Sequence, residues 1–365
     1  MNKIFLTITF FLSLCVSTLG FQSVSFAVLS DHVANLKSCG ENDNTAACNG
    51  ACKTNASGHI EIGALGLPVD ADDATSYVDN CSMIPDLYRV TLYSGGLCTA
   101  DPYSASGTTV DYTTNCDLFF SDASGKVITL TSNGDGTATA SPSLTDGDVN
   151  LGIKTYTHAF MVMSNHLQIK HSSTFDFSGT STASKMQGGG ASAESEGVVC
   201  WSTDSTSTFS NLDGTGHGRT LRAGNGTFGE ASTQCGDTLG GTHAYATEII
   251  ETFGEASGNW GGTIEPRMEY SASQLDIGGT KAAILLQDID GVKTTVATTM
   301  ENGVAMLYAV ALTTPLAITE DTTSFNIGFG ISGSVSVDFT NKDGSDELYI
   351  SKHGADPVDI KFTAE

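Results

Sequence analysis

Two histidines have the most chemically suggestive spacing in this chain of 365 residues. His158 lies in the alternating run TYTHAFMV, and His171 lies in the next run, LQIKHSSTFDF. The intervening Asn165-His166 pair predicts a two-residue hairpin turn, because Asn tolerates the left-handed backbone that such a turn needs. The resulting register pairs Val162 with Ile169, Phe160 with His171, and His158 with Ser173, so that apolar residues meet on one face.

In that register His158 and His171 are diagonal neighbours on the same face, at about 7 Å between backbones. Two imidazoles at this spacing could hold a zinc or copper ion. A metal site needs further ligands, and the sequence offers no obvious third one. We therefore interpret both side chains as packed or hydrogen-bonded histidines, and keep a metal site at His158 and His171 as the alternative hypothesis.

Other patterns that resemble catalytic or ligand-binding motifs are incomplete. Glu248 and Glu251 near Trp260 resemble a glycosidase pair, but on a strand residues three apart point to opposite faces. Gly214-x-Gly216-x-Gly218 lacks the lysine and the preceding strand of a phosphate loop. Asp288-x-Asp290-Gly291 and Asn341-x-Asp343-Gly344 are fragments of calcium loops, and are better explained as Asx-Gly turns. The sequence thus predicts no catalytic residue, no cofactor and no enzyme activity.

The elements that must position these residues are predicted to be strands. From Phe325 to Phe339 apolar residues occupy nearly every odd position, which indicates a long strand with one buried face. A turn at Asp343-Gly344 predicts a hairpin that pairs this strand with the C-terminal segment. The predicted pairs are Phe339–Leu348, Val337–Ile350, Phe329–Val358, Ile327–Ile360 and Phe325–Phe362. Pro357, in an interruption at 353–357, favours a second arm at a sheet edge.

Further strands are predicted at 87–93, 118–121, 126–131, 243–253, 282–288, 293–299 and 304–313, where β-branched and aromatic residues alternate between turn residues. Asn302-Gly303 predicts a hairpin between the last two. The expected fold class is all-β, mainly an antiparallel β-sandwich. A small Cys-rich, partly helical N-terminal segment is expected at 28–80, with short helices near 31–40 and 70–80.

The N-terminus is predicted to be a signal peptide at residues 1–27. Lys3 is followed by the apolar run 4–14 and by Ser25-Phe26-Ala27, which is typical of a cleavage site. Lipidation at Cys15 is an alternative that the preceding Leu14 disfavours. No other segment is apolar enough to span a membrane as a helix. We expect an exported protein that is extracellular or attached to the cell surface, with the periplasm as an alternative.

Eight cysteines follow the predicted signal, and in an exported chain an even number indicates disulfides. They are Cys39, Cys48, Cys52, Cys81, Cys98, Cys116, Cys200 and Cys235. We predict the pairs Cys98–Cys116 and Cys200–Cys235, with the four N-terminal cysteines paired among themselves. Residues 81–365 are expected to form the β ectodomain. The Gly/Ser-rich range 178–243 is expected to be an excursion from it, or a boundary between two β domains.

The formal net charge of -25 argues against a nucleic-acid or anionic-membrane partner, because both bind basic surfaces. The favoured hypothesis is an exported, disulfide-bridged structural or adhesive β-protein, an adhesin or a subunit of a surface assembly. Its partners would be itself, other surface proteins or glycans. The main alternative is a secreted glycan- or ligand-binding module that uses the loops at 99–115 or 201–242. An outer-membrane barrel and a secreted hydrolase are less favoured.

Overall fold

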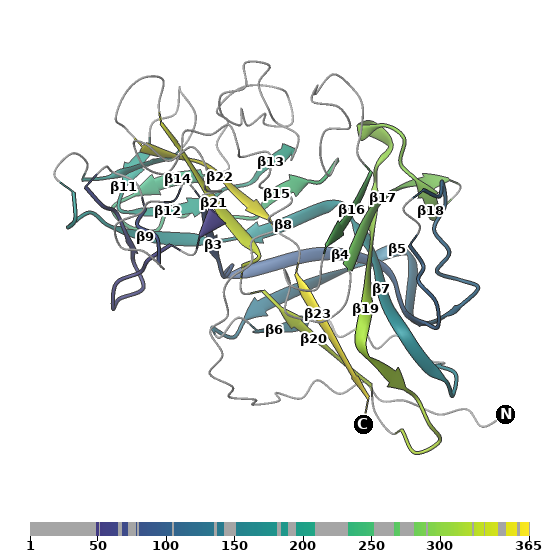
Figure 1. Cartoon of the computed structure of the whole chain (residues 1–365). Helices are drawn as coiled ribbons and strands as arrows, with labels where there is room; N and C mark the ends of the chain where they lie inside the picture. The colour runs from purple at the N-terminus through teal and green to yellow at the C-terminus, as the bar shows by residue number, and fades with distance from the viewer. Residues whose placement is uncertain are drawn as a thin grey trace.

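The structure is a computed structural model of the whole chain (Figure 1). It describes residues 49–50, 52–64, 68–71, 78, 80–103, 106–134, 137–141, 151–180, 184–188, 195–208, 233–251, 266–270, 281–289, 291–322, 325–331, 333–341, 348–355 and 358–364. The strands are β1 (Asn49–Gly50), β2 (Ile60–Glu61), β3 (Asn80–Met83), β4 (Leu87–Cys98), β5 (Cys116–Ser132), β6 (Thr137–Ser141), β7 (Thr155–Ser164), β8 (His166–Lys170), β9 (Ser172–Asp176), β10 (Met186–Gly188), β11 (Ser195–Gly197), β12 (Val199–Ser202), β13 (Ser205–Thr208), β14 (Thr233–Gly236), β15 (Ala246–Ile249), β16 (Arg267–Tyr270), β17 (Lys281–Ile289), β18 (Val292–Val296), β19 (Ala305–Ala317), β20 (Phe325–Gly330), β21 (Val335–Asn341), β22 (Leu348–Ala355) and β23 (Asp359–Ala364).

The predicted all-β fold class is confirmed. Within the described residues the only helical element is a single 3-10 turn at Met300–Asn302. A 13-stranded sheet contains the path β16-β17-β19-β7-β4-β5-β6-β20-β23. A six-stranded sheet has the order β1-β3-β21-β22-β10-β11, and a four-stranded sheet has the order β14-β12-β9-β2. Most pairs are antiparallel, as a sheet with local connections allows.

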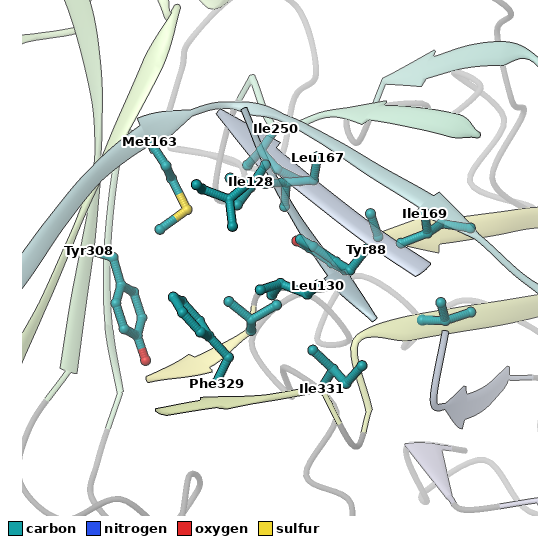
Figure 2. Close-up of a cluster of buried hydrophobic side chains, with 14 of the residues drawn as sticks. Tyr88, Ile128, Leu130, Met163, Leu167, Ile169, Ile250, Tyr308, Phe329 and Ile331 are labelled. Carbon is teal, nitrogen blue, oxygen red and sulfur yellow. The ribbon is translucent and has the colours of Figure 1, made fainter. Parts of the chain in front are cut away.

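The large sheet is built on β4 and β5, which pair from Leu87 opposite Thr131 to Cys98 opposite Cys116. Residues of β5 alternate in exposure, because Ile128 and Leu130 are buried while Val127 and Thr131 are exposed. Side chains from β5, β7, β19 and β20 point into one interior (Figure 2). In this interior, side chains of the large sheet form one continuous apolar cluster with side chains of the two smaller sheets.

A second apolar cluster lies on the opposite face of the same strands. Phe160 and Val162 of β7 belong to it, whereas Met161 and Met163 belong to the first cluster. Successive side chains of a strand point to opposite faces, so β7 is buried on both. Val110 and Tyr112 from the loop at 99–115 complete the second cluster.

The two smaller sheets pack face to face as a sandwich (Figure 1). Phe175 of β9 contacts Phe339 of β21 edge to face, with 6.0 Å between ring centroids. Strands β10 to β14 come from the range 178–243 that was expected to be an excursion. In this range β12 pairs with β9 and β10 pairs with β22, so its described parts contribute to both smaller sheets.

The predicted hairpin at Asn165-His166 is wrong. β7 and β8 do not pair with each other: both pair with β4, so that they follow one another along the same neighbouring strand. Asn165 lies at the junction and is completely buried. Its side-chain amide donates hydrogen bonds to the carbonyl oxygens of Ile250, at 3.0 Å, and Gly303, at 2.9 Å. These two bonds anchor the junction within the fold.

The predicted C-terminal pairing is correct in its partners but wrong in its register. The long strand is divided into β20 and β21, which lie in different sheets. β20 pairs with β23, with Ile327 opposite Phe362. β21 pairs with β22, with Phe339 opposite Ile350. The β20–β23 register and the part of the β21–β22 register from Phe339 onward differ from the prediction by two residues, a shift that keeps the same side chains on the same face. A bulge between Asp338 and Phe339 makes the difference three residues in the rest of β21, where Val337 lies opposite His353.

The predicted hairpin at Asn302-Gly303 is also wrong, since β18 and β19 each pair with β17 instead of with one another. The hairpin turn lies between β17 and β18, where Gly291 has a φ of +83°. The Gly291 N–H donates to Asp288 Oδ1 at 2.7 Å, which confirms an Asx-type turn at this place. Asp290 and the turn at Asp343-Gly344 lie outside the described residues.

Both specific disulfide predictions, Cys98–Cys116 and Cys200–Cys235, are confirmed. Each joins directly opposite residues of adjacent strands, in β4–β5 and β12–β14. Cys52–Cys81 is a third bridge and falls within the predicted N-terminal group. Cys39, Cys48, the predicted signal peptide with Cys15, and most of the two predicted N-terminal helices lie outside the described residues. None of the described segments is a helix of the length and hydropathy needed to span a bilayer.

Candidate functional site

The structure does not bring His158 and His171 together. His158 lies on β7 between Cys98 of β4 and Ala311 of β19, and its Nδ1 is 2.9 Å from Thr157 Oγ1. His171 follows β8, beyond the buried junction at Asn165. Because β7 and β8 run end to end, the two histidines lie toward opposite ends of one extended path. No group of three or more potential metal ligands is assembled among the residues that the structure describes.

Instead, His171 belongs to a cluster with two histidines from distant parts of the chain. The buried histidine cluster is defined here as His171, His243 and His353, together with Asp86. The His171 and His353 rings meet edge to face, with 5.5 Å between centroids and an interplanar angle of 67°. His171 is 3% exposed and His353 is 1% exposed. His243 Nε2 lies 3.7 Å from Asp86 Oδ2 at the rim of the cluster.

Hydroxyl groups supply hydrogen-bond partners to the two central rings. His171 Nε2 lies 2.8 Å from Ser173 Oγ, and His353 Nδ1 lies 2.8 Å from Thr233 Oγ1. Ser173 is on β9 and Thr233 is on β14, both in the four-stranded sheet, whereas His353 is on β22 of the six-stranded sheet. The cluster therefore lies at the interface between the facing sheets of the sandwich.

The surroundings of the cluster disfavour positive charge on His171 and His243. Burial lowers the pKa of His171 to about 4, and this effect exceeds the opposing attraction of Asp86. His243 acts in the same direction as burial. The pKa of His243 is itself lowered, first by burial and then by Lys170. His171 is therefore neutral at neutral pH.

Ser173 and His171 have the separation of a nucleophile and its general base. Both side chains, however, are 3% exposed, and Ser173 Oγ also contacts Met83 Sδ at 3.6 Å. A substrate has no access to this pair in the folded structure. The arrangement is suited to joining strands through neutral hydrogen bonds, and to responding when a ring gains a proton.

Glu248 has a structural contact that explains its burial. It lies on β15 and is 4% exposed, and its Oε2 accepts a hydrogen bond of 2.6 Å from the backbone N–H of Ala355 at the end of β22. Glu251 is also buried and follows β15. Trp260, the third residue of the glycosidase-like pattern, lies outside the described residues.

The loop at 99–115, predicted as a ligand site, is held against the second apolar cluster. The Cys98–Cys116 bridge closes it, and Thr99 N–H donates to the carbonyl of Asn115 at 2.8 Å. Tyr112 packs on Phe160 with 5.1 Å between ring centroids, and its hydroxyl donates to the carbonyl of Lys293 at 3.1 Å. The described part of this loop is thus a rigid cover over β7, β18 and β19.

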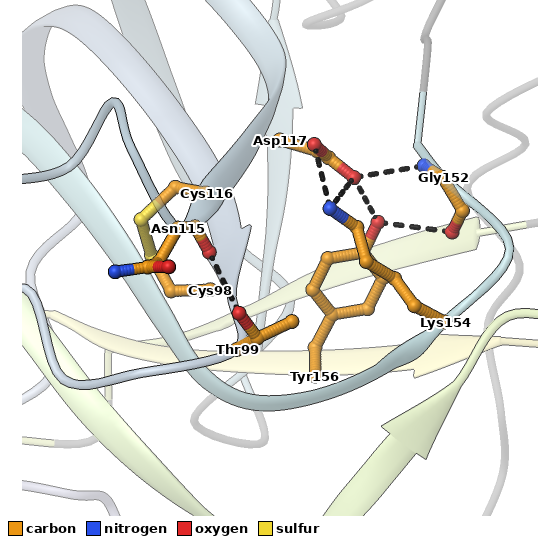
Figure 3. A network of polar contacts seen from close by, with 8 residues as sticks. All are labelled: Cys98, Thr99, Asn115, Cys116, Asp117, Gly152, Lys154 and Tyr156. Atoms are coloured by element: carbon orange, nitrogen blue, oxygen red, sulfur yellow. Dashed lines mark hydrogen bonds and ion pairs between the residues drawn. A yellow bond between two sulfur atoms is a disulfide. The ribbon is translucent and has the colours of Figure 1, made fainter.

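A polar network fixes the chain beside this bridge (Figure 3). Asp117 accepts hydrogen bonds from the Tyr156 hydroxyl, from Gly152 N–H at 2.9 Å and from Lys154 Nζ at 3.1 Å. Burial alone would raise the pKa of Asp117, but these donors together lower it. Burial, followed by the hydrogen bond to Asp117, raises the pKa of Tyr156. The network stabilises the ionised carboxylate and the neutral phenol.

The second predicted ligand loop, 201–242, is described only at its two ends. Trp201 is 5% exposed and its Nε1–H donates to Thr242 Oγ1 at 3.0 Å. The glycines at 214, 216 and 218 lie outside the described residues. No match exists for this chain among protein-family models, curated proteins or solved structures.

Sequence reasoning missed His243 and His353 as partners of His171. His353 was placed in the predicted interruption at 353–357, whereas it lies within β22. The spacing gave no signal, because residues three apart on a regular strand point to opposite faces, and a bulge in the β21–β22 pairing is what buries both Ile350 and His353. The contact itself depends on how two sheets face each other, which alternation along one strand does not specify.

Proposed function

We propose that this chain is an exported structural or adhesive β-protein that acts in a cell-surface or extracellular assembly and has no catalytic activity. Its partners are further copies of itself or other surface proteins. Three disulfide bridges within an all-β fold fit an extracellular β-protein. The net charge of -25 supports protein or glycan partners over nucleic acid.

The observation that best supports this proposal is the edge of the largest sheet. β23 pairs with β20 on one side, and among the described residues no strand pairs with its other side. The N–H and C=O groups on the free side of an edge strand are a template for a strand of another chain. An edge of six residues, Asp359–Ala364, is long enough to add one ordinary strand.

Proline substitutions at two consecutive positions of β23 test this use of the edge. Along a strand, successive N–H groups point to opposite neighbours, so one of Lys361→Pro and Phe362→Pro removes an outward N–H. That variant is expected to lose assembly and keep its fold. The other removes a hydrogen bond to β20 and is expected to lower the thermal midpoint.

Size-exclusion chromatography and electron microscopy of the secreted protein measure assembly, and circular dichroism measures folding. Lys361→Ala retains the backbone N–H and is the matched control, expected to assemble like the wild type. A wild-type protein that stays strictly monomeric and associates with no surface or polymer would refute the proposal. So would two proline variants that both assemble normally.

A glycan- or ligand-binding module is the second candidate, and the rigidity of the loop at 99–115 favours it. A loop that is closed by a disulfide and packed on the core loses little entropy when it binds a ligand. Its exposed residues include Asp101 and Asp111, whose carboxylates are common acceptors for sugar hydroxyls. A glycan array with no hits for the secreted protein would remove this candidate.

A further inference from the structure

We propose that His171 and His353 form an acid-sensitive latch between the two sheets of the smaller sandwich. In the neutral state the latch holds β22 against the four-stranded sheet, and protonation releases it. This inference concerns the stability of the sandwich and does not depend on the proposed role in assembly.

The geometry of the contact is the first support. The His353–Thr233 hydrogen bond and the edge-to-face contact between His353 and His171 both cross from β22 to the opposite sheet. His171 is further tied to its own sheet, because its backbone N–H donates to Ser202 Oγ at 3.0 Å and Ser202 N–H donates to its carbonyl at 2.9 Å. The two rings are thus fixed relative to their sheets, and the sheets are joined at this point through the rings.

The charged groups around the cluster determine how it responds to protons. Asp86 faces it from the segment before β4, but its carboxylate also binds Ser172 Oγ, at 3.1 Å, and lies near His243. Glu248 faces the end of β22 from β15, where its Oε2 is engaged by Ala355 N–H. Lys170, on β8, lowers the pKa of His243, and His243 in turn lowers the pKa of His171.

Whichever ring is protonated first, a second proton places two imidazolium rings at a centroid distance of 5.5 Å within a buried interface. Two like charges at such a short distance repel strongly when they are shielded from water. Opening the sheets restores solvent to both rings, so the open form takes up protons more readily than the closed form.

The direction of the pH effect follows from His171. Its pKa in the folded protein is about 4, below the ordinary value of 6.5, because burial disfavours the charged ring. As the pH falls below about 6.5, the open form binds a proton that the closed form does not, and the closed form loses stability until about pH 4. At pH 5 this single group shifts the opening equilibrium about 20-fold relative to pH 7.

Hydrogen exchange on the full-length, oxidised protein at pH 7 and pH 5 tests the latch, after correction for intrinsic exchange rates. Amides of β22, β9 and β14 are expected to open about 20-fold more often at pH 5 than at pH 7. Amides of β4 and β5 in the large sheet are expected to change far less. An equal increase in all strands, or no increase in β22, would overturn the proposal.

A variant separates the latch from a general effect of acid. His171→Gln is expected to abolish the extra opening of β22 at pH 5, while His158→Gln, a half-buried histidine in the large sheet, leaves it unchanged. If His171→Gln does not fold, the exchange pattern of the wild type and an NMR titration of its histidine rings test the latch instead. A His171 ring that titrates near pH 6.5 in the folded protein would refute the latch.

Discussion

Adjacent residues of β5 provide a sharp test of which face of the large sheet is buried. Ile128 is 0% exposed and Val127 is 48% exposed, although both are β-branched residues in the middle of the same strand. The two substitutions to compare are Ile128→Ala and Val127→Ala. They change neighbouring positions by similar chemistry, so their difference reports the environment of each side chain.

The expected magnitudes differ several-fold. Ile128→Ala removes three buried carbons, about 2.4 kcal/mol of transfer free energy, and leaves a cavity that raises the total to about 3–4 kcal/mol. Val127→Ala removes two carbons that are about half solvated, so the loss of burial is about 0.8 kcal/mol. The lower strand propensity of Ala adds a few tenths to both variants.

Urea unfolding followed by far-ultraviolet circular dichroism measures both variants under non-oxidising, non-reducing conditions that leave the bridges intact. The free energy of unfolding is compared at equal slopes, because a change in slope would signal an altered denatured state. Equal losses for the two variants, or a larger loss for Val127→Ala, would refute the assignment of the buried face. Such a result would mean that β5 is displaced by one residue against β4.

Three further predictions test other parts of the fold. Loss of the bridge in Cys200→Ala/Cys235→Ala is expected to cost about 4 kcal/mol, because the bridge closes a sequence separation of 35; urea unfolding measures it, and a loss under about 1 kcal/mol would contradict it. The folded pKa of Asp117 is lowered, so its stabilisation is present above the unfolded pKa and is lost as the pH falls through the folded value. The thermal midpoint should therefore fall less in acid for Asp117→Asn than for the wild type, and an equal fall in both proteins would contradict this role of the carboxylate. Gly96→Ala places a methyl group 2.6 Å from an aromatic carbon and is expected to cost about 1–3 kcal/mol, whereas Gly303→Ala meets nothing closer than 3.7 Å and should be nearly neutral by the same unfolding measurement.

Much of the strand content could be predicted because apolar and polar residues alternate along short segments of the sequence. The pattern Leu87–Tyr93 places every second residue inside, and the structure buries Tyr88, Val90 and Leu92 accordingly. The pairs Cys98–Cys116 and Cys200–Cys235 were accessible for a related reason. Each pair flanks one polar loop, and the strands on either side of such a loop tend to pair.

The strand registers and the role of Asn165 could not be predicted from the local sequence. A shift of two residues leaves every side chain on its original face, so alternation alone could not distinguish Ile327 opposite Ile360 from Ile327 opposite Phe362. Asn165 has the chemistry of a turn residue, yet its amide is engaged by carbonyls that come from residues 85 and 138 positions away. Such distant partners decide between a turn and a continuous path, and they are not visible in the local sequence.

The candidate site could not be predicted from the sequence for the same physical reason. His171 was singled out as a candidate metal ligand, but its partner was sought on the adjacent strand, where the sequence offered His158. The actual contact with His353 joins residues on facing sheets. A strand pattern predicts which side chains are buried, whereas the packing of two sheets decides which buried side chains meet.

The C-terminal segment connects the two proposals physically. β22 ends at Ala355 in the six-stranded sheet and β23 begins at Asp359 in the large sheet, so only residues 356–358 separate the latch strand from the edge strand. His353 lies two residues before that crossing, and Glu248 binds the N–H of Ala355 at the crossing itself. Release of β22 by acid would therefore loosen the chain segment that leads directly into β23. An assembly that adds strands to β23 would then depend on an edge strand that pairs with β20 and follows, after three intervening residues, the strand that carries His353.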